Sequence, residues 1–392
     1  MPGSPSLDLV AAPPVLPVEF HGYRNDCRHF RGEKPCQFKC EDACRHFEPF
    51  GKRILVIKLG ATGDVLRTTP LLHSLKERFP DSHITWIVEP VSAPLLRANP
   101  LIDRIFLPGY ETLARLQSET FDLVYCLDKV EAATALAMTA RGTQKWGFGL
   151  TEQGTLSIFN PEAEYALRLG VSDHLKFHVN QKPYQQIVFE AVGFEYTGQP
   201  YILELDSDAM TWARGFLLTQ GVKFEPGRPI VGLNTGAGTG FAGKAWRVEK
   251  WTALARKASE ALGAQMLLLG GPQERDRNAE IVGRSGGAVI DTGTDNTLER
   301  FCSLVDLCDV VVTGDTTGMH VAIARQKPVI ALFGSTCAQE IDLYGRGEKI
   351  VTEVACAPCY LKKCPIGEIC LDDIRLDAVF AALQRQIETL GR

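Results

Sequence analysis

The chain has 392 residues, of which 45% are hydrophobic and 23% charged, and its formal net charge is −5. This length supports two domains with hydrophobic cores, and the composition is that of a globular protein. The acidic net charge argues against a nucleic-acid partner, and no apolar run approaches the roughly 20 residues that span a bilayer.

The chain begins with a proline-rich leader and a cysteine-rich segment, which together occupy residues 1–50. The leader has neither a basic start nor a sustained apolar core, so we expect a cytoplasmic protein. The cysteines that follow have the spacing C-x8-C-x3-C-x3-C, at Cys27, Cys36, Cys40 and Cys44. Clustered cysteines without an export signal favour metal ligation over disulfides, and His29 and His46 could replace a cysteine ligand.

Strands and helices then alternate, first within residues 51–183. We predict strands at 53–58, 83–89, 102–108 and 121–128, and helices at 64–79, 92–99, 114–119 and 130–140. Residues 141–200 are less regular, although 182–194 has a helical pattern. This order is typical of a doubly wound parallel sheet, and we take residues 184–228 as a linker region.

A second alternation occupies residues 229–370. Here we predict strands at 229–236, 264–271, 288–292, 309–315 and 328–335, and helices at 248–262, 272–285, 297–308 and 317–326. Residues 371–392 read as a terminal helix. Two α/β domains of this kind imply a cleft between two sheets, where ligands bind at the carboxyl ends of the strands.

The loop after the first predicted strand carries a lone carboxylate. In KLGATGDVLRTTPLL, residues 58–72, Asp64 stands where a helix begins, close to Gly60 and Gly63. A helix-capping role would explain an aspartate there. A carboxylate at a helix N-terminus also stays ionised, and glycines admit a ligand close to the backbone, so Asp64 could take a proton from a substrate hydroxyl.

Another strand-to-helix turn, VVTGDTTGMHVAIA at residues 311–324, has the features of a phosphate site. Free amides at a helix N-terminus bind phosphate, and Thr316 and Thr317 add hydroxyl donors. The alternative is an ordinary capped turn. His320 lies one turn into the helix, where a histidine is more often structural than catalytic.

The stretch NTGAGTGFAGKAW, residues 234–246, contains the pattern G-x-G-x-x-G at Gly238, Gly240 and Gly243. A dinucleotide turn needs its helix to open inside this motif, whereas the predicted helix starts only at about Val248. We therefore interpret it as a loop that presents Lys244 to an anion, or else as a plain surface loop. At the next strand end, Glu274 could accept the two hydroxyls of a ribose or simply favour the helix dipole.

A second cysteine cluster lies near the C-terminus, with the spacing C-x2-C-x4-C-x5-C at Cys356, Cys359, Cys364 and Cys370. Four thiolates favour structural zinc or iron, and four cysteines in either cluster could also hold an iron–sulfur cluster. Neither cluster falls in the strand-to-helix turns, so we expect the metal to be structural. The remaining cysteines read as core thiols, namely Cys126, Cys302, Cys308 and Cys337.

Four segments occur in the order and spacing of the family 9 glycosyltransferases, which include the heptosyltransferases of lipopolysaccharide core assembly. They are KLGATGDVLRTTPLLHSLKERFP, LNTGAGTGFAGKAWRVEKW, LGGPQERD and VVTGDTTGMHVAIARQKPVIALFGST, and the resemblance covers roughly residues 51–392. It implies a GT-B fold, with two Rossmann-like domains facing across a cleft and the last helix returning to the N-terminal domain. It also implies transfer of a sugar, typically heptose, from a nucleotide donor, typically ADP-activated, with inversion.

The resemblance also implies roles for individual residues. Asp64 stands where the family has its catalytic base, and Lys244, Glu274 and the turn that follows residue 314 stand where it holds the donor. The substrate-binding residues expected on this basis are Thr62, Gly63, Thr235, Gly236, Lys244, Trp246, Glu274, Asp315, Thr316, Thr317, Gly318, Met319 and His320. No catalytic metal is needed, in line with the lack of a D-x-D motif near the cleft turns.

The expected partners are a nucleotide-sugar donor and a glycan or glycolipid acceptor. The C-terminal cysteines are similar to the iron finger of a branch that heptosylates autotransporter proteins, so a metal-stabilised protein O-heptosyltransferase is an alternative. An NAD-dependent oxidoreductase and a non-catalytic metal-dependent scaffold are further alternatives. Lys362 and Lys363 could contact anionic lipid at the inner membrane face.

Overall fold

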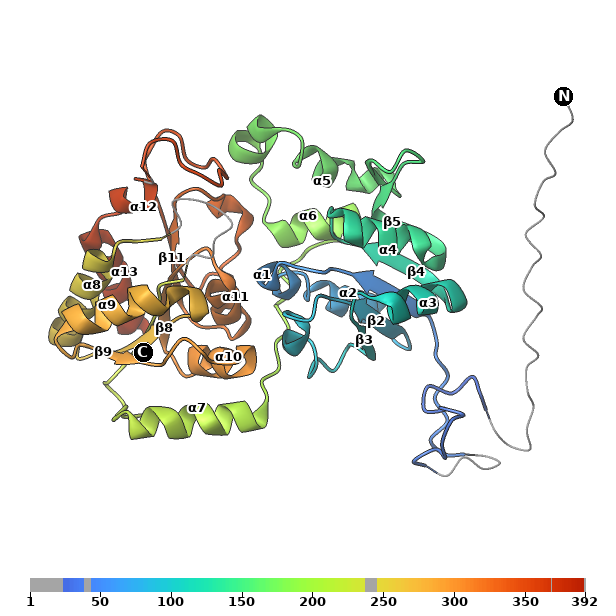
Figure 1. Cartoon of the computed structure of the whole chain (residues 1–392), viewed down its shortest axis with the longest axis horizontal. Coiled ribbons are helices and arrows are strands. Elements are labelled where there is room, and N and C mark those ends of the chain that lie inside the picture. The colour runs from blue at the N-terminus through green and yellow to red at the C-terminus, as the bar shows by residue number, and fades with distance from the viewer. Residues whose placement is uncertain (1–23, 39–43, 237–244, 368, 391–392) are drawn as a thin grey trace, which may run out of the picture.

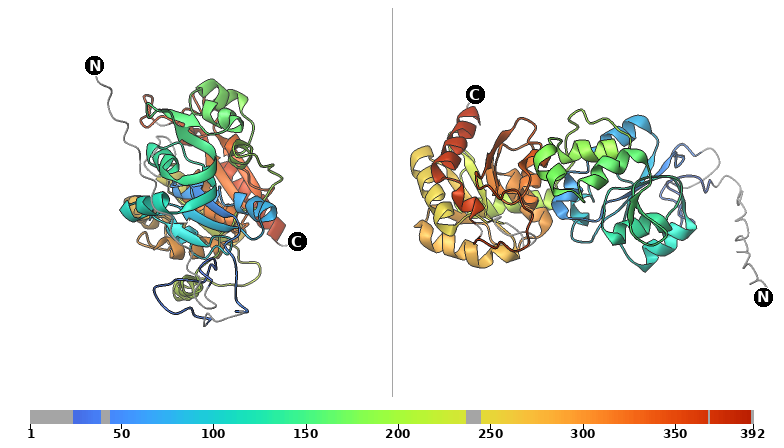
Figure 2. Two further views of the ribbon diagram at one scale, coloured as in Figure 1. Left: turned by 90° about the vertical axis from the view of Figure 1, so that its right-hand side faces the viewer. Right: turned by 90° about the horizontal axis from the view of Figure 1, so that it is seen from above.

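The computed structural model describes residues 24–38, 44–236, 245–367 and 369–390. Two α/β domains, each built on one six-stranded sheet, form two lobes that lie side by side (Figures 1 and 2). The two doubly wound domains predicted from the sequence are therefore confirmed. Within the described ranges, no helix is long and apolar enough to cross a membrane.

The N-terminal sheet has the strand order β3-β2-β1-β4-β5-β6, and only β6 runs antiparallel to its neighbour. Its strands are β1 (Arg53–Ile57), β2 (His83–Ile87), β3 (Arg104–Phe106), β4 (Thr120–Cys126), β5 (Arg141–Leu150) and β6 (Leu156–Ile158). Its helices are α1 (Thr62–Leu66), α2 (Leu71–Arg78), α3 (Tyr110–Ser118), α4 (Glu131–Thr139), α5 (Glu164–Arg168) and α6 (Tyr184–Ala191), with short turns η1 (Ala93–Leu95), η2 (Pro161–Ala163) and η3 (Leu175–Val179).

The C-terminal sheet has the order β12-β11-β10-β7-β8-β9, with all strands parallel. Its strands are β7 (Ile230–Asn234), β8 (Gln265–Leu269), β9 (Val289–Asp291), β10 (Val310–Gly314), β11 (Val329–Phe333) and β12 (Gly347–Val351). Its helices are α7 (Ser207–Thr219), α8 (Val248–Leu262), α9 (Arg275–Ser285), α10 (Leu298–Asp306), α11 (Thr317–Ala324), α12 (Cys370–Asp373) and α13 (Leu376–Leu390), with short turns η4 (Pro272–Glu274) and η5 (Ala338–Glu340).

The strands are apolar throughout because helices cover both faces of each sheet. In β1, Ile54 and Val56 pack into one core layer, and Leu55 and Ile57 pack into the layer on the opposite face. Successive side chains of a strand point to opposite faces, so a continuous apolar run is the pattern of a sheet buried on both sides. This pattern explains why the central strands can be recognised from the sequence.

The helix predicted at 64–79 is divided into α1 and α2. The helical hydrogen bonding is interrupted between them, where Pro70 has no amide hydrogen. The Thr68 hydroxyl donates to the carbonyl of Asp64 at 2.7 Å, which is a local alternative to a continuous helix. The division leaves α1 as a short element that carries Asp64 at the end of β1.

Strand β5 lies in a region that the sequence pattern presents as irregular, because RGTQKWGFGL contains three glycines. At Gly147, φ is +87° and an added Cβ would lie 2.1 Å from the carbonyl oxygen of Cys126. Glycine is required at such a position because L side chains rarely adopt this conformation and no side chain fits there. This glycine therefore marks close packing against β4, and not a loop.

The boundaries expected for the linker and the terminal helix need correction. Helix α6 lies inside the proposed linker but buries Val188 and Phe189 in the N-terminal core. Helix α13 does not return to the N-terminal domain: it packs on α8 and the C-terminal sheet through Val379, Ala382 and Leu383. Its apolar stripe packs against strands of its own domain. Figure 1 shows this red helix within the C-terminal lobe.

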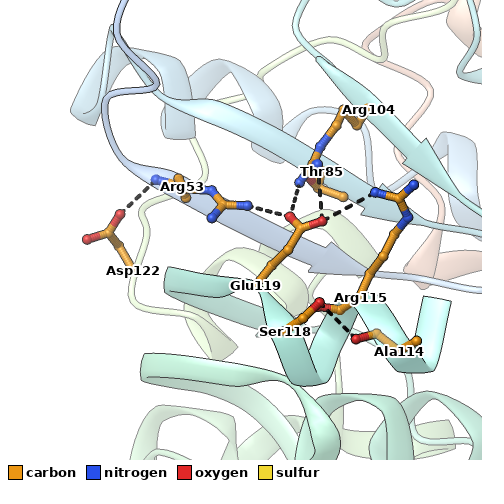
Figure 3. Close-up of polar contacts among 8 residues, drawn as sticks. All are labelled: Arg53, Thr85, Arg104, Ala114, Arg115, Ser118, Glu119 and Asp122. Carbon is orange, nitrogen blue, oxygen red and sulfur yellow. Dashed lines mark hydrogen bonds and ion pairs between the residues drawn. The ribbon is translucent and has the colours of Figure 1, made fainter. Parts of the chain in front are cut away.

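A charged cluster joins the amino ends of strands in the N-terminal sheet (Figure 3). Glu119, just before β4, pairs with Arg53 at 2.5 Å and with Arg104 at 2.7 Å. Burial raises the pKa of Glu119, but these arginines outweigh it and hold the pKa below its usual value. The cluster stabilises the sheet and leaves the carboxyl ends of its strands for ligands.

Candidate active site

The two domains enclose a cavity of about 790 Å³ at the carboxyl ends of their sheets. Residues of the loop after β1 line it on one side, and the loops after β7, β8, β10 and β11 line it on the other. This is the position at which open α/β sheets bind ligands. The predicted site residues that line it are Thr62, Gly63, Asp64, Gly236, Glu274, Asp315, Thr316, Thr317, Gly318 and His320.

The domains touch directly where α1 meets α11. An added Cβ on Gly63 would lie only 2.4 Å from Cδ2 of His320, so this glycine is needed for the close approach. Leu66 of α1 belongs to the same apolar cluster as Met319 of α11. The His320 ring is also fixed from another side, because its Nδ1 lies 3.3 Å from the Tyr201 hydroxyl. Asp64, next in the chain to Gly63, is thus held at the domain contact.

Asp64 is surrounded by positive charge. Its Oδ1 lies 2.8 Å from the Arg67 guanidinium, and its Oδ2 lies 3.8 Å from Lys58 Nζ. Burial raises the pKa of Asp64, but Arg67, Lys58 and His320 outweigh this effect, so the pKa lies below its usual value. About a third (33%) of the side-chain surface stays exposed. Asp64 is therefore an ionised acceptor that a ligand in the cavity can reach.

A second carboxylate, Asp128, organises this loop and is absent from the residues expected from the sequence. Its Oδ2 accepts hydrogen bonds from the amides of Leu59 (3.2 Å) and Gly60 (3.4 Å) and lies 3.4 Å from Lys58 Nζ. Lys58 is buried between the two aspartates, whose charges and the nearby Tyr184 raise its pKa although burial opposes this. The sequence could have indicated Asp128, because it stands two residues after the end of β4, where site residues of such sheets lie.

The turn after β10, for which a phosphate site is predicted, joins β10 to α11. Thr316 caps α11, because its hydroxyl accepts from the Met319 amide at 3.3 Å. Asn234, at the end of β7, donates to that hydroxyl at 2.8 Å and so fixes it from the neighbouring strand. The first amides of a helix have no intrahelical acceptor, and they favour an anion in the cavity.

Glu274 lines the part of the cavity that the C-terminal domain forms, in the turn after β8. Its Oε2 accepts from the Gly271 amide at 2.9 Å, which fixes the carboxylate at the start of α9. Asn296, Leu298 and Phe301 line the same cavity. An acidic group with neighbouring apolar and aromatic surface suits a nucleoside, whose ribose offers hydroxyls and whose base is flat and apolar.

Three predicted binding residues do not line the cavity. Trp246 is buried in the core, where its Nε1 donates to the Ile374 carbonyl at 3.3 Å. Thr235 is buried, and its hydroxyl lies 2.5 Å from Asn278 Oδ1. Met319 is fully buried at the domain contact. These side chains support the loops that bear the site, so the binding role given to them needs correction. Lys244 lies outside the described residues.

Residues 111–370 match the family model described as glycosyltransferase family 9 (heptosyltransferase). The chain belongs to this family. It is a glycosyltransferase, as the resemblance implied.

Relatives of this glycosyltransferase include heptosyltransferases. Lipooligosaccharide heptosyltransferase 2 of Campylobacter jejuni O:2 is 22% identical over 81% of this chain and 92% of its own length. The lipooligosaccharide heptosyltransferase 2 of C. jejuni O:6 is 27% identical, but the match covers only 41% of this chain and 52% of that protein. The structure of E. coli ADP-heptose lps heptosyltransferase II has a TM-score of 0.64 at 19% identity, covering 87% and 100% of the two chains. This likeness confirms the GT-B fold.

A smaller chamber of about 300 Å³ adjoins the main cavity of the glycosyltransferase. Arg67, Lys176 and Glu340 line both spaces. Lys58 and Lys129 add two further cations to the chamber wall. Burial, with help from Lys176, lowers the pKa of Lys129 to about 8, and its ammonium donates to the Ala166 carbonyl. The sequence does not predict the chamber, because its cations come from segments far apart in the chain.

Each cysteine cluster of the glycosyltransferase surrounds one small space. Cys356, Cys359, Cys364 and Cys370 line a cavity of about 20 Å³. Cys27, Cys36 and Cys44 line one of about 10 Å³ with His29 and His46, while Cys40 lies outside the described residues. In the described part of the chain, no group of three or more metal-binding side chains has the geometry to hold an ion. The metal thus stays a prediction.

The four isolated cysteines are buried, as expected. Burial raises the pKa of Cys126, Cys302 and Cys308 to about 12, so these thiols stay protonated. Cys337 differs in lining the main cavity, but burial raises its pKa to about 11.

A structural neighbour described as the iron-containing dodecameric glycosyltransferase TibC from enterotoxigenic E. coli has a TM-score of 0.53 at 12% identity, covering 87% and 77% of the two chains.

Proposed function

We propose that the chain is an inverting heptosyltransferase that moves heptose from ADP-heptose to a hydroxyl of a lipopolysaccharide-core acceptor. The observation that carries this proposal is the position of Asp64, an ionised carboxylate that shares one cavity with the phosphate turn of the other domain. The names of the family 9 relatives support heptose as the sugar, and the name of the E. coli enzyme, which includes ADP-heptose, supports ADP as the carrier. A cytoplasmic reaction is part of this proposal.

In the proposed step, the acceptor hydroxyl oxygen attacks the anomeric carbon of the donor. A bond forms between these atoms while the bond from the anomeric carbon to the diphosphate oxygen breaks. Asp64 takes the hydroxyl proton, which is typically worth about 10²–10⁴-fold in rate. Arg67 keeps Asp64 ionised and orients it. Attack from the side opposite the leaving group inverts the configuration at the anomeric carbon.

The leaving nucleoside diphosphate would be stabilised by the C-terminal domain. The amides at the start of α11 meet its charge, and the cap made by Thr316 and Asn234 holds that turn in place. Glu274 would hold the ribose, and Lys244 would be a further cation for the diphosphate. Hydrogen bonds hold Thr316, Asn234 and Glu274 in place, so these groups need little rearrangement when the bond breaks.

The acceptor would enter the smaller chamber of the N-terminal domain. Lys129 supports this placement, because burial lowers its pKa to about 8. The charged form of such a buried cation is stabilised when an anion binds beside it. Lys176 lies between the chamber and the main cavity. The chamber thus fits an acidic sugar or a phosphate group better than a peptide segment, and this favours a glycan acceptor over a protein one.

The test is sugar transfer and nucleotide binding with matched variants. We expect transfer of one heptose from ADP-heptose to truncated lipopolysaccharide, detected by mass spectrometry, and tighter binding of ADP than of UDP, GDP or NADH in calorimetry. Glu274→Gln should weaken ADP about tenfold, because the neutral amide is a weaker acceptor for ribose hydroxyls. Asp276→Asn, which removes an exposed charge two residues away, is the control. Binding of NADH alone would contradict the proposal.

We also propose structural zinc or iron at the C-terminal cysteines. Four thiols around one small space suit either ion, and one structural neighbour is described as iron-containing. Elemental analysis of protein purified without chelator should find about one ion for this cluster. Cys364→Ser should lose that ion and lower the melting temperature, whereas the core variant Cys308→Ala should keep it. Metal-free wild-type protein would contradict the assignment. We propose a structural metal of the same kind at the N-terminal cluster, bound by Cys27, Cys36, Cys40 and Cys44.

A further inference from the structure

Tyr360 belongs to the C-terminal cysteine loop but lines the main cavity. It follows Cys359 directly and precedes Cys364. Its ring lies parallel to that of Phe177, with centroids 5.6 Å apart, and Lys176 Nζ lies 3.8 Å from its ring centre. Both partners belong to η3 of the other domain. One aromatic side chain of the cysteine loop thus contacts the N-terminal domain through stacking and a cation–π interaction.

Other groups of the C-terminal domain also contact Lys176 of the N-terminal domain. The Lys176 carbonyl accepts from Gln339 Nε2 at 3.3 Å and lies 3.9 Å from Cys337 Sγ. The Tyr360 hydroxyl accepts from the Cys337 amide at 3.2 Å and lies 3.5 Å from Glu340 Oε2. Lys176 is therefore held at both its backbone and its ammonium group, at the point where the chamber opens into the main cavity.

The cysteine loop determines where Tyr360 stands. The amides of Cys359 and Tyr360 both donate to the Ser335 carbonyl, at 3.1 and 2.9 Å, and Ser335 lines the small space between the four cysteines. Tyr360 has a φ of +52°, which a residue with a side chain keeps only where its surroundings enforce it. Here Tyr360 lies between Cys359 and Cys364 in the chain, and the Ser335 carbonyl holds its amide.

We propose that Tyr360 is a positioning residue that couples the cysteine loop to acceptor binding. It fixes Lys176 at the opening of the chamber and joins the two domains there, so that an anionic acceptor is held with its hydroxyl near Asp64. This inference rests on the proposed function for the identity of the acceptor, but the domain contact itself does not. An intact cysteine cluster is then a requirement for acceptor binding and not only for stability.

Steady-state kinetics separate this role from a structural one. We expect Tyr360→Ala to raise the acceptor KM about tenfold, with the affinity for ADP unchanged, because only contacts near the acceptor are lost. Tyr360→Phe keeps the ring and should stay within about twofold of wild type. Cys364→Ser should reproduce the effect of Tyr360→Ala. Glu353→Gln, at an exposed position of the segment that leads into the same loop, is the control.

Hydrogen–deuterium exchange gives a second measurement that needs no activity. Amides of residues 172–180 should exchange faster in Tyr360→Ala and Cys364→Ser than in wild type, Tyr360→Phe and Glu353→Gln. Unchanged exchange in Tyr360→Ala overturns the proposal, as does an unchanged acceptor KM or an equal loss of ADP and acceptor affinity. If wild-type protein transfers no sugar, the proposed function fails, and the exchange experiment still decides whether Tyr360 joins the domains.

Discussion

Replacing Asp64 with asparagine is expected to lower kcat by about 10²–10⁴-fold. Asparagine has nearly the same shape but cannot take the proton of the attacking hydroxyl. The affinity for ADP should stay close to wild type, because the phosphate turn and Glu274 lie on the other domain. Initial rates with ADP-heptose at saturating acceptor, together with calorimetry of ADP binding, measure the two quantities separately.

Two controls make the Asp64→Asn result interpretable. Asp173→Asn changes an exposed aspartate outside the cavity and should leave the rate unchanged. Because Asp64→Asn leaves the buried Arg67 without its partner at 2.8 Å, the melting temperature must also be recorded. A folded Asp64→Asn protein that keeps more than about a tenth of wild-type kcat would refute the role of Asp64 as the base.

Adding one methyl group at Gly63 is expected to lower kcat by about 10²-fold. The new Cβ would start 2.4 Å from Cδ2 of His320, so α1 and α11 must separate by a substantial fraction of an ångström or more. That separation moves Asp64 away from the phosphate turn, and a displacement of about 1 Å at reacting groups is enough for such a loss. The rate of transfer by Gly63→Ala, measured as for Asp64→Asn, checks this expectation.

The matched control is Gly215→Ala in α7, where an added Cβ meets no atom within 4 Å. This change should leave the rate unaltered and should not lower the melting temperature, since alanine favours a helix more than glycine does. Wild-type kinetics in Gly63→Ala would show that the contact between α1 and α11 does not hold the site together.

The placement of candidate residues at the strand ends could be predicted from the sequence, because it depends on local order along the chain. Asp64 and Thr316 each follow an apolar strand and begin a helix, and parallel strands bring such turns to the same edge. The structure places both at one cavity. Strand β5 could not be predicted in this way, because the glycine that permits its close packing on β4 also marks loops.

Residues that act through the domain contact could not be predicted. Arg67, Lys176 and Glu340 surround the opening between chamber and cavity, but they lie in three separate segments, and only Arg67 falls in a motif, where no role was expected for it. Trp246 shows the opposite error. It follows the glycine-rich loop in the sequence, which suggests a ligand contact, whereas its apolar surface is buried against Trp251 with ring centroids 5.2 Å apart.

Under the proposed function, the contact between Gly63 and His320 makes sugar transfer depend on both lobes at once. The proposed proton acceptor belongs to one lobe and the proposed anion-binding turn to the other, and the interface between them leaves no room for one extra carbon atom at Gly63. An opened molecule that carries donor alone would have no base near the anomeric carbon. Water would then have no assistance in attacking the activated sugar, so separated lobes would protect the donor from hydrolysis.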